Sequence, residues 1–258
     1  MRDLLRFEFR KLRTQKSFYI CLAIMIAMIL ITGITYKVVL DYMPETAEAV
    51  ETEGGETLPK TFSGFLLGFL SASNFSLIAA VFVSIVVCTD YEGQTIKNIY
   101  ARGYSRENYY LSKLIYVFTV TTVMFLAAFT VSALFGAVFF GTSGIDGKCF
   151  LLIAIQYLAS MAEVALYFAI SSMIKKLGGA IAICIFAPML VSLLLGLGDT
   201  ALKLEDFKIT NAWLSSFTSD LANSTVGTGR IVACAVLSVV YAVLFIAAGF
   251  AFNRKTEV

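Results

Sequence analysis

The stretch LGGAIAICIFAPMLVSLLLGL, residues 177 to 197, holds no charged side chain and decides the class of fold. A helix of this length, rising about 1.5 Å per residue, spans the roughly 30 Å of hydrocarbon in a bilayer. The core of a water-soluble domain does not need so long an uninterrupted apolar run. The stretch therefore predicts a helix that crosses a membrane.

Five further apolar stretches of comparable length occur along the chain. Because lipid offers the backbone no hydrogen-bond partner, each stretch is expected to be helical. The composition agrees, since 59% of the residues are hydrophobic and 15% are charged, whereas soluble domains carry about 25% charged residues. The sequence predicts an all-α polytopic membrane protein, one transmembrane domain over residues 1 to 258. Its six crossings are expected at residues 18 to 40, 62 to 88, 112 to 140, 149 to 174, 177 to 197 and 231 to 252.

Charged residues are distributed unevenly among the segments that connect the apolar stretches. With the N-terminus placed inside, fourteen of the 20 Lys and Arg residues fall on the inner side. Eleven of the 18 acidic residues fall on the outer side, many of them in the first outer loop between Glu45 and Glu56. Loops rich in Lys and Arg stay in the cytoplasm. We therefore expect a multi-pass protein of the cell (plasma) membrane with both termini in the cytoplasm.

Residues 1 to 17 have the pattern of a helix that lies at the membrane surface. Helical spacing places Leu5, Phe9 and Leu12 on one stripe and arginines on the stripe beside it. The apolar stripe suits acyl chains, and the guanidinium groups suit lipid phosphates or an acidic protein partner. A plain positive-inside anchor explains the charges equally well. The candidate interfacial residues are Arg6, Phe9, Arg10 and Arg13.

The outer segment before the last crossing, residues 198 to 230, mixes apolar and charged residues. Trp213, Phe217 and Leu221 are among its apolar side chains. This mixture is typical of helices that lie at, or dip into, the membrane interface. We expect interfacial or re-entrant helices here.

The connection between the second and third stretches, residues 90 to 106, is the segment most indicative of function. Ile96, Ile99 and Tyr100 have the i, i+3, i+4 spacing of one helix face. A short helix here would present an apolar knob to the cytoplasm, where another protein can dock. A tight connector that packs on its own bundle explains the same pattern. Gly103 can end this helix, and Ser105 can cap the next one.

The chain resembles the membrane-spanning subunits of ABC-2 type transporters, which are the permeases of many bacterial exporters. One part of the resemblance is the N-terminal segment LLRFEFRKLRTQKSFY, residues 4 to 19. The other is a loop that holds Glu92, Gly93, Thr95, Ile96, Ser105, Arg106 and Lys113. In layout the resemblance extends over essentially the whole chain: six crossings, both termini inside, and interfacial helices before the last crossing.

The resemblance implies a coupling helix at about Glu92 to Tyr100 that sits in a cleft of a separate ATP-hydrolysing subunit. The permease would work as a dimer of identical or different chains. Its cargo would be amphipathic or lipid-like, such as an antimicrobial peptide or a drug. ATP and Mg²⁺ would bind the partner ATPase, because this chain lacks a phosphate-cradling loop. The coupling residues are then Glu92, Gly93, Thr95, Ile96, Ile99, Tyr100, Gly103, Ser105 and Arg106.

Several classes of function are disfavoured by what the sequence lacks. The chain has no histidine, which removes Ser-His and Cys-His nucleophiles and histidine zinc sites. We expect no catalytic residue, no metal site and no cofactor bound by this chain. A net charge of +2 is too small for a nucleic-acid partner, so the expected partners are the ATPase, a second permease chain and membrane lipid.

Glu163 is an ionisable residue deep within the fourth stretch. It lies twelve positions before Lys175, or about 18 Å along a helix, which is near the middle of the bilayer. A carboxyl group at that depth usually faces the interior of a bundle or a wet cavity. We expect Glu163 to line the translocation pathway or a subunit interface. A structural hydrogen bond to a neighbouring helix is the alternative.

Other functions remain open for a protein with six crossings. An ion-coupled secondary transporter would show several intramembrane charges and two similar halves, of which only Glu163 is seen. An intramembrane enzyme would need a pair of acids or metal ligands. A membrane signalling or interaction partner without transport has no sequence signature of its own.

Overall fold

The computed structural model describes residues 2–12, 15–42, 61–141, 147–201, 209–222 and 226–255. These residues form helices and no strand, and six of the helices are long and apolar enough to cross a membrane. The predicted all-α polytopic fold is confirmed. The six long helices are α2 (Lys16–Tyr42), α6 (Phe75–Glu92), α8 (Arg106–Phe140), α9 (Gly147–Ile174), α10 (Leu177–Ala201) and α12 (Thr228–Lys255).

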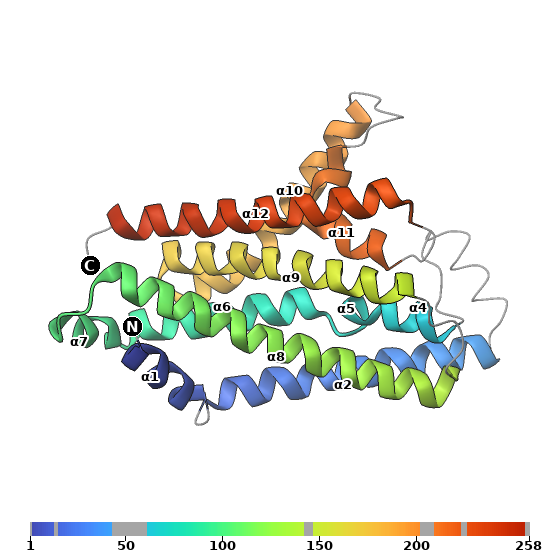
Figure 1. Cartoon of the computed structure of the whole chain (residues 1–258), viewed down its shortest axis with the longest axis horizontal. Helices are drawn as coiled ribbons and strands as arrows, with labels where there is room; N and C mark the ends of the chain where they lie inside the picture. The colour runs from blue at the N-terminus through green and yellow to red at the C-terminus, as the bar shows by residue number, and fades with distance from the viewer. Residues whose placement is uncertain are drawn as a thin grey trace.

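Six short helices complete the described residues. They are α1 (Arg2–Leu12), α4 (Phe62–Leu67), α5 (Phe69–Ala72), α7 (Thr95–Ala101), η1 (Ile209–Ala212) and α11 (Leu214–Leu221). The start of α1, the whole of α7 and the last turns of α12 lie at one end of the bundle, which we call the α7 end (Figure 1). Helices α4 and α11 lie toward the opposite end (Figure 1).

Helix α9 is the centre of the bundle. It packs against α6, α8, α10, α11 and α12. Small side chains allow membrane helices to approach closely, and α9 buries a row of alanines against its neighbours. Gly249 of α12 marks a close approach: an added Cβ there would lie 3.3 Å from Ala169 of α9 and 2.5 Å from the Tyr110 hydroxyl of α8. The buried alanines of α9 are Ala159, Ala162, Ala165 and Ala169.

The second apolar stretch, predicted as one helix over residues 62 to 88, is broken into α4, α5 and α6. Asn74, directly before α6, has a left-handed backbone with φ of 49°. Side chains bond to carbonyl groups at the break: Gln156 Nε2 donates to Leu67 at 2.9 Å, and Ser73 Oγ donates to Leu70 at 3.1 Å. The crossing is α6 alone, whose 18 residues extend about 27 Å.

Helix α10 is the least buried of the long helices. Only Ala180 and Cys184 of this helix are buried, and its far end runs obliquely past α12 (Figure 1). It also continues to Ala201, beyond the predicted end at residue 197. Most apolar side chains of α10 are therefore available to lipid or to another chain.

Helices η1 and α11 occupy the segment where interfacial or re-entrant helices were predicted. Leu214, Phe217 and Leu221 of α11 are buried, because the helix packs against α9 and α12. The guanidinium of Arg230 pairs with Asp220 and holds the start of α12 to α11.

The first outer loop, with its predicted acidic character, falls largely within residues 43–60, outside the described residues.

Candidate functional site

Helix α7 connects α6 to α8 and stands at the tip of the α7 end (Figure 1). Two left-handed residues flank it, Gln94 with φ of 52° and Gly103 with φ of 84°. Gly103 adopts this conformation without steric cost because it has no Cβ. Ser105 then caps α8, since the Asn108 N–H donates to its Oγ at 3.3 Å. The predicted helix end at Gly103 and cap at Ser105 are confirmed.

The apolar face of α7 is turned into the protein. Ile96 is 1% exposed and Ile99 is 8% exposed, and both pack with Leu4 of α1 and Tyr109 of α8. The prediction of an apolar knob open to the cytoplasm is therefore wrong. The physical reason is that α1 offers apolar surface nearby, so the two isoleucines leave water within their own chain. The alternative interpretation, a connector packed on its own bundle, describes these contacts.

Polar side chains form the exposed edge of the loop from residue 92 to 106. Tyr100 is half-buried, with its ring edge-on to Tyr109 at 6.2 Å and the Arg106 guanidinium 6.0 Å from its centroid. Burial raises the pKa of the Tyr100 phenol, and Arg106 partly opposes this. A partner that docks here meets polar and cationic groups. The exposed residues are Glu92, Gly93, Gln94, Lys97, Ala101, Arg102, Gly103 and Ser105, with Thr95 and Arg106 half-buried.

Glu92 joins this loop to α10. Its Oε1 accepts a hydrogen bond at 2.8 Å from the N–H of Leu177, the first residue of α10. The first N–H groups of a helix have no partner inside it, and a helix N-terminus favours negative charge. Lys175, which ends α9, has a left-handed φ of 59° and turns the chain sharply into α10. A displacement of Glu92 therefore acts directly on the start of α10.

Four charged side chains, Glu8, Lys11, Asp90 and Lys113, meet where α1, α6 and α8 converge, and we call them the charge cluster. Lys113 donates to both carboxylate oxygens of Glu8, at 3.2 and 3.0 Å, and also pairs with Asp90. Lys11 pairs with the other oxygen of Asp90, and the Tyr109 hydroxyl donates to Asp90 at 3.2 Å. Glu8, Asp90 and Lys113 are each at most 2% exposed. Two cations thus balance two anions, and of the four side chains only that of Lys11 is partly exposed.

The predicted interfacial residues lie on the outer side of α1. Arg6 and Arg10 are exposed, and Phe9 is 37% exposed with its ring 5.7 Å from that of Tyr116. Arg13 lies outside the described residues. The face of α1 that meets the bundle carries Leu4 and Glu8. The contact of the Leu5, Phe9 and Leu12 stripe with acyl chains stays a prediction.

Glu163 lies inside the bundle, on the side of α9 that faces α6. It is 7% exposed, and the Ser76 hydroxyl of α6 is within hydrogen-bonding reach of its carboxyl group. Ser76 also bonds to Tyr167 at 2.5 Å, and Ser84 bonds to Ser171 at 3.2 Å further along the same two helices. Glu163 therefore belongs to a polar seam between α6 and α9 within one chain.

A family model described as ABC-2 family transporter protein matches residues 4–197. The match extends over well more than half of the chain. The chain belongs to the ABC-2 transporter family. No curated protein sequence matches this transporter. Membership makes it the membrane-spanning subunit of an ABC transporter, a class of permease that works with an ABC ATPase.

The matched part of the ABC-2 transporter contains the features described above. It extends from Leu4 of α1 through the loop of residues 92 to 106 to Leu197 of α10. The charge cluster and Glu163 both fall within it. Helices η1, α11 and α12 follow the matched residues.

Sequence reasoning assigned no role to the charge cluster of the ABC-2 transporter. Asp90 and Lys113 stand at the ends of apolar stretches, where charged residues are ordinary. One signal was present in the segment before the first crossing. Glu8 follows Leu4 by four positions and therefore shares its helix face. A helix that only displayed positive charge to the membrane surface would not need an acid on that face. An acid on the apolar side of a basic helix indicates a cationic partner in the bundle.

Proposed function

We propose that this ABC-2 transporter is the permease of an ATP-driven exporter, and that the loop of residues 92 to 106 docks on a separate ATPase subunit. The observation that carries the proposal is how α7 is held. Its apolar face is fixed to α1 and α8, while its polar edge is exposed. Close-packed interiors transmit displacement with little compression. A push on the polar edge is therefore passed to the bundle instead of being absorbed by a flexible loop.

Three connections lead from this loop into the crossings. Ser105 caps α8, so α7 and α8 are joined through the short turn at Gly103. Glu92 holds the first N–H of α10. The charge cluster fixes α1 and the end of α6 to α8. ATP and Mg²⁺ would bind the partner, and closure of two ATPase subunits would move α8 and α10 together.

The orientation, assembly and cargo are part of the same proposal. The excess of Lys and Arg in the predicted inner segments supports a cytoplasmic α7 end in the cell membrane. The exposed apolar face of α10 supports a second permease chain, identical or different, beside it. The long apolar helices support an amphipathic or lipid-like cargo, such as an antimicrobial peptide or a drug, with Glu163 as the candidate residue of the translocation pathway.

Site-directed photo-crosslinking of the permease in membranes of the source cell tests whether the loop docks on an ATPase. The cysteines in the described residues are all buried, so an introduced exposed cysteine can carry a photo-crosslinker selectively. Gln94→Cys on the loop should capture an ABC ATPase, identified by mass spectrometry. Asn211→Cys, exposed on η1 and outside the loop of residues 92 to 106, is the matched control. Equal capture from both positions, or no ATPase from Gln94→Cys, would contradict docking through this loop.

Charge reversal on the exposed edge gives a second test. Lys97→Glu and Arg102→Glu leave the buried face of α7 intact, because both side chains are exposed. Each should weaken co-purification of the ATPase by about tenfold, the effect of losing one charge-assisted contact. Asn211→Glu should leave co-purification unchanged. Cargo transport driven by an ion gradient without ATP would favour the secondary transporter instead, and stable capture of a non-ATPase receptor would favour a signalling partner.

A further inference from the structure

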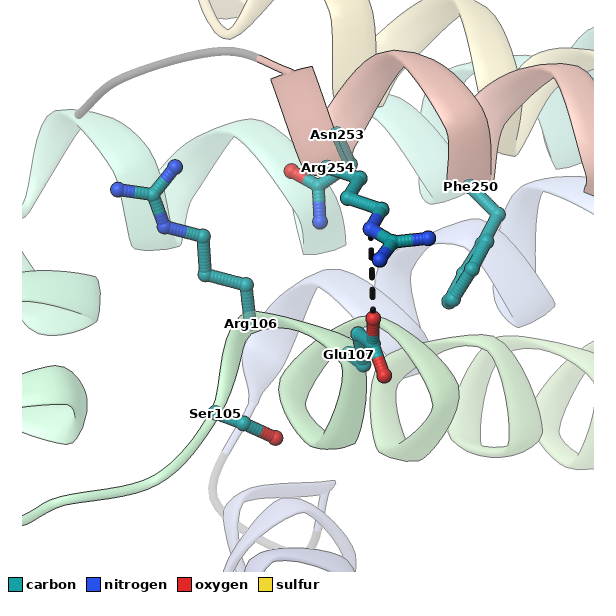
Figure 2. A pocket seen from close by; sticks show the side chains of 6 residues that line it. All are labelled: Ser105, Arg106, Glu107, Phe250, Asn253 and Arg254. Atoms are coloured by element: carbon teal, nitrogen blue, oxygen red, sulfur yellow. Dashed lines mark ion pairs between the residues drawn. The ribbon is translucent and has the colours of Figure 1, made fainter.

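A pocket of about 210 Å³ opens at the α7 end, between the first turn of α8 and the last turns of α12. Figure 2 shows the six side chains that line it. One wall is apolar, since the Phe250 ring packs edge-on against Tyr110 at 5.7 Å. The other walls carry hydrogen-bond donors and charge. The lining residues are Ser105, Arg106, Glu107, Phe250, Asn253 and Arg254.

Asn253 is the buried polar group of this pocket. Its residue is 6% exposed, and its Oδ1 accepts a hydrogen bond from the Tyr91 hydroxyl at 3.5 Å. Its amide nitrogen has no acceptor among the residues that the structure describes. Figure 2 shows this nitrogen directed into the hollow between the backbone of Arg106 and Glu107. The pocket therefore holds an N–H donor that no described residue engages and that an external acceptor can reach.

Positive charge prevails around this donor. Arg254 Nε and Glu107 Oε1 are 3.8 Å apart, and their side chains are 74% and 52% exposed. A long and exposed ion pair is weak, so a doubly charged anion can displace Glu107 as the partner of Arg254. Arg106 also lines the pocket, although Figure 2 shows its guanidinium turned away from the other lining side chains. Burial, and then the charge of Arg106, lower the pKa of Lys175, a further cation near Arg106.

The position of the pocket matches the depth of lipid phosphates. Helix α8 begins at Arg106, about 9 Å before the predicted start of its crossing at residue 112, and α12 ends at Lys255, close to the predicted end of its crossing at residue 252. The pocket therefore lies just outside the hydrocarbon. Basic side chains at helix ends commonly meet headgroups at this level, and Phe250 offers an apolar surface beside them. Guanidinium groups suit phosphate because they present paired donors in a plane.

We propose that Asn253 and Arg254, beside the backbone of Arg106, form a binding site for a phosphate group. An anionic lipid headgroup and a soluble phosphate share this chemistry. The occupant would bridge α8 and α12 beside the turn that connects α7 to α8. It would also contact Arg106, whose guanidinium lies over the ring of Tyr100 in α7.

The test uses the full-length protein in nanodiscs of phosphatidylcholine, titrated with fluorescent phosphatidylglycerol. Arg254→Gln and Asn253→Leu should each weaken phosphatidylglycerol binding by about tenfold, because each removes a donor to a charged acceptor. Lys97→Gln removes the same charge from an exposed position on α7, outside the pocket lining, and should leave binding unchanged. Arg254 is exposed, so its variant should fold normally, which thermal unfolding can check.

A second arm distinguishes the two sources of the phosphate group. Inorganic phosphate is added, with chloride at equal ionic strength as the control. Phosphatidylglycerol binding that falls in the two variants and resists inorganic phosphate supports the site with a lipid occupant. If inorganic phosphate at millimolar concentration displaces phosphatidylglycerol from the unaltered protein but not from the variants, the result supports the site with a soluble occupant. The proposal is overturned if Arg254→Gln and Asn253→Leu bind both probes as the unaltered protein does.

Discussion

Lys113 and Asp90 form an ion pair in which both residues are 1% exposed, at the point where α1, α6 and α8 meet. Lys113 also donates to Glu8 of α1, so one ammonium group links three elements. Buried ions depend on their partners because water cannot replace a lost contact. The pair therefore holds α1 and α6 to α8 at the α7 end, as the proposed coupling to an ATPase would require.

Replacing Lys113 by Met should lower the free energy of unfolding by about 3–5 kcal/mol, the usual cost of breaking a buried pair. The physical reason is that Glu8 and Asp90 would face each other with only Lys11 to compensate. Chemical unfolding of the purified protein in detergent measures the change. Lys97→Met, at an exposed position, is the control and should stay within about 0.5 kcal/mol of the unaltered protein.

A neutralised cluster separates charge from packing. The triple variant Glu8→Gln, Asp90→Asn and Lys113→Met removes all three buried charges and should recover most of the loss, because no unpaired ion is left inside. If Lys113→Met alone unfolds like Lys97→Met, the charge cluster does not hold this end together.

The burial of α7 predicts a local effect. Ile96→Ala should cost about 2–5 kcal/mol, because it empties a packed site between Leu4 and Tyr109. The loss should appear first as detachment of α7, measured by faster tryptic cleavage after Arg102. Lys97→Ala leaves the packed face untouched and should not change cleavage at Arg102. Equal cleavage in both variants would show that α7 is not held by its apolar face.

Much of this fold follows from local rules that the sequence exposes. The six crossings are predictable because the thickness of the bilayer sets the length of an apolar run. The turn at Gly103 and the cap at Ser105 are predictable because each depends on one residue and its own backbone. None of these features requires knowledge of which segments meet in space.

The features that sequence reasoning missed all depend on distant partners. Glu8 and Lys113 are 105 positions apart, and the sequence around either residue does not indicate that the other is its partner. Ile96 shows an apolar face, but only the structure shows that Leu4 covers it. The break before α6 is hidden because hydrophobicity continues through it, and Gln156 of α9 satisfies the carbonyl of Leu67.

The close approach of α12 to α9 predicts a strict size limit at Gly249. Gly249→Ala should lower the free energy of unfolding by about 1–3 kcal/mol, the usual cost of overpacking, because the new methyl group meets Tyr110 and Ala169. Gly229→Ala, in the same helix, has open space around its Cβ position and should not destabilise the protein. Thermal unfolding compares the two. Equal behaviour would show that the helices are further apart than the structure has them.

Glu163 is suited to a test that separates transport from structure. Glu163→Gln keeps the shape of the side chain and its contact with Ser76, so assembly and unfolding should stay unchanged. If the carboxyl group contacts cargo in the pathway, ATP-driven efflux from vesicles should fall by about tenfold. Ser76→Ala is the opposite control, because it removes a hydrogen bond between α6 and α9 and should cost about 1 kcal/mol of stability without slowing efflux. Full efflux in Glu163→Gln with normal assembly would assign Glu163 to the polar seam alone, since a carboxyl group that acts on cargo cannot be replaced by an amide without loss.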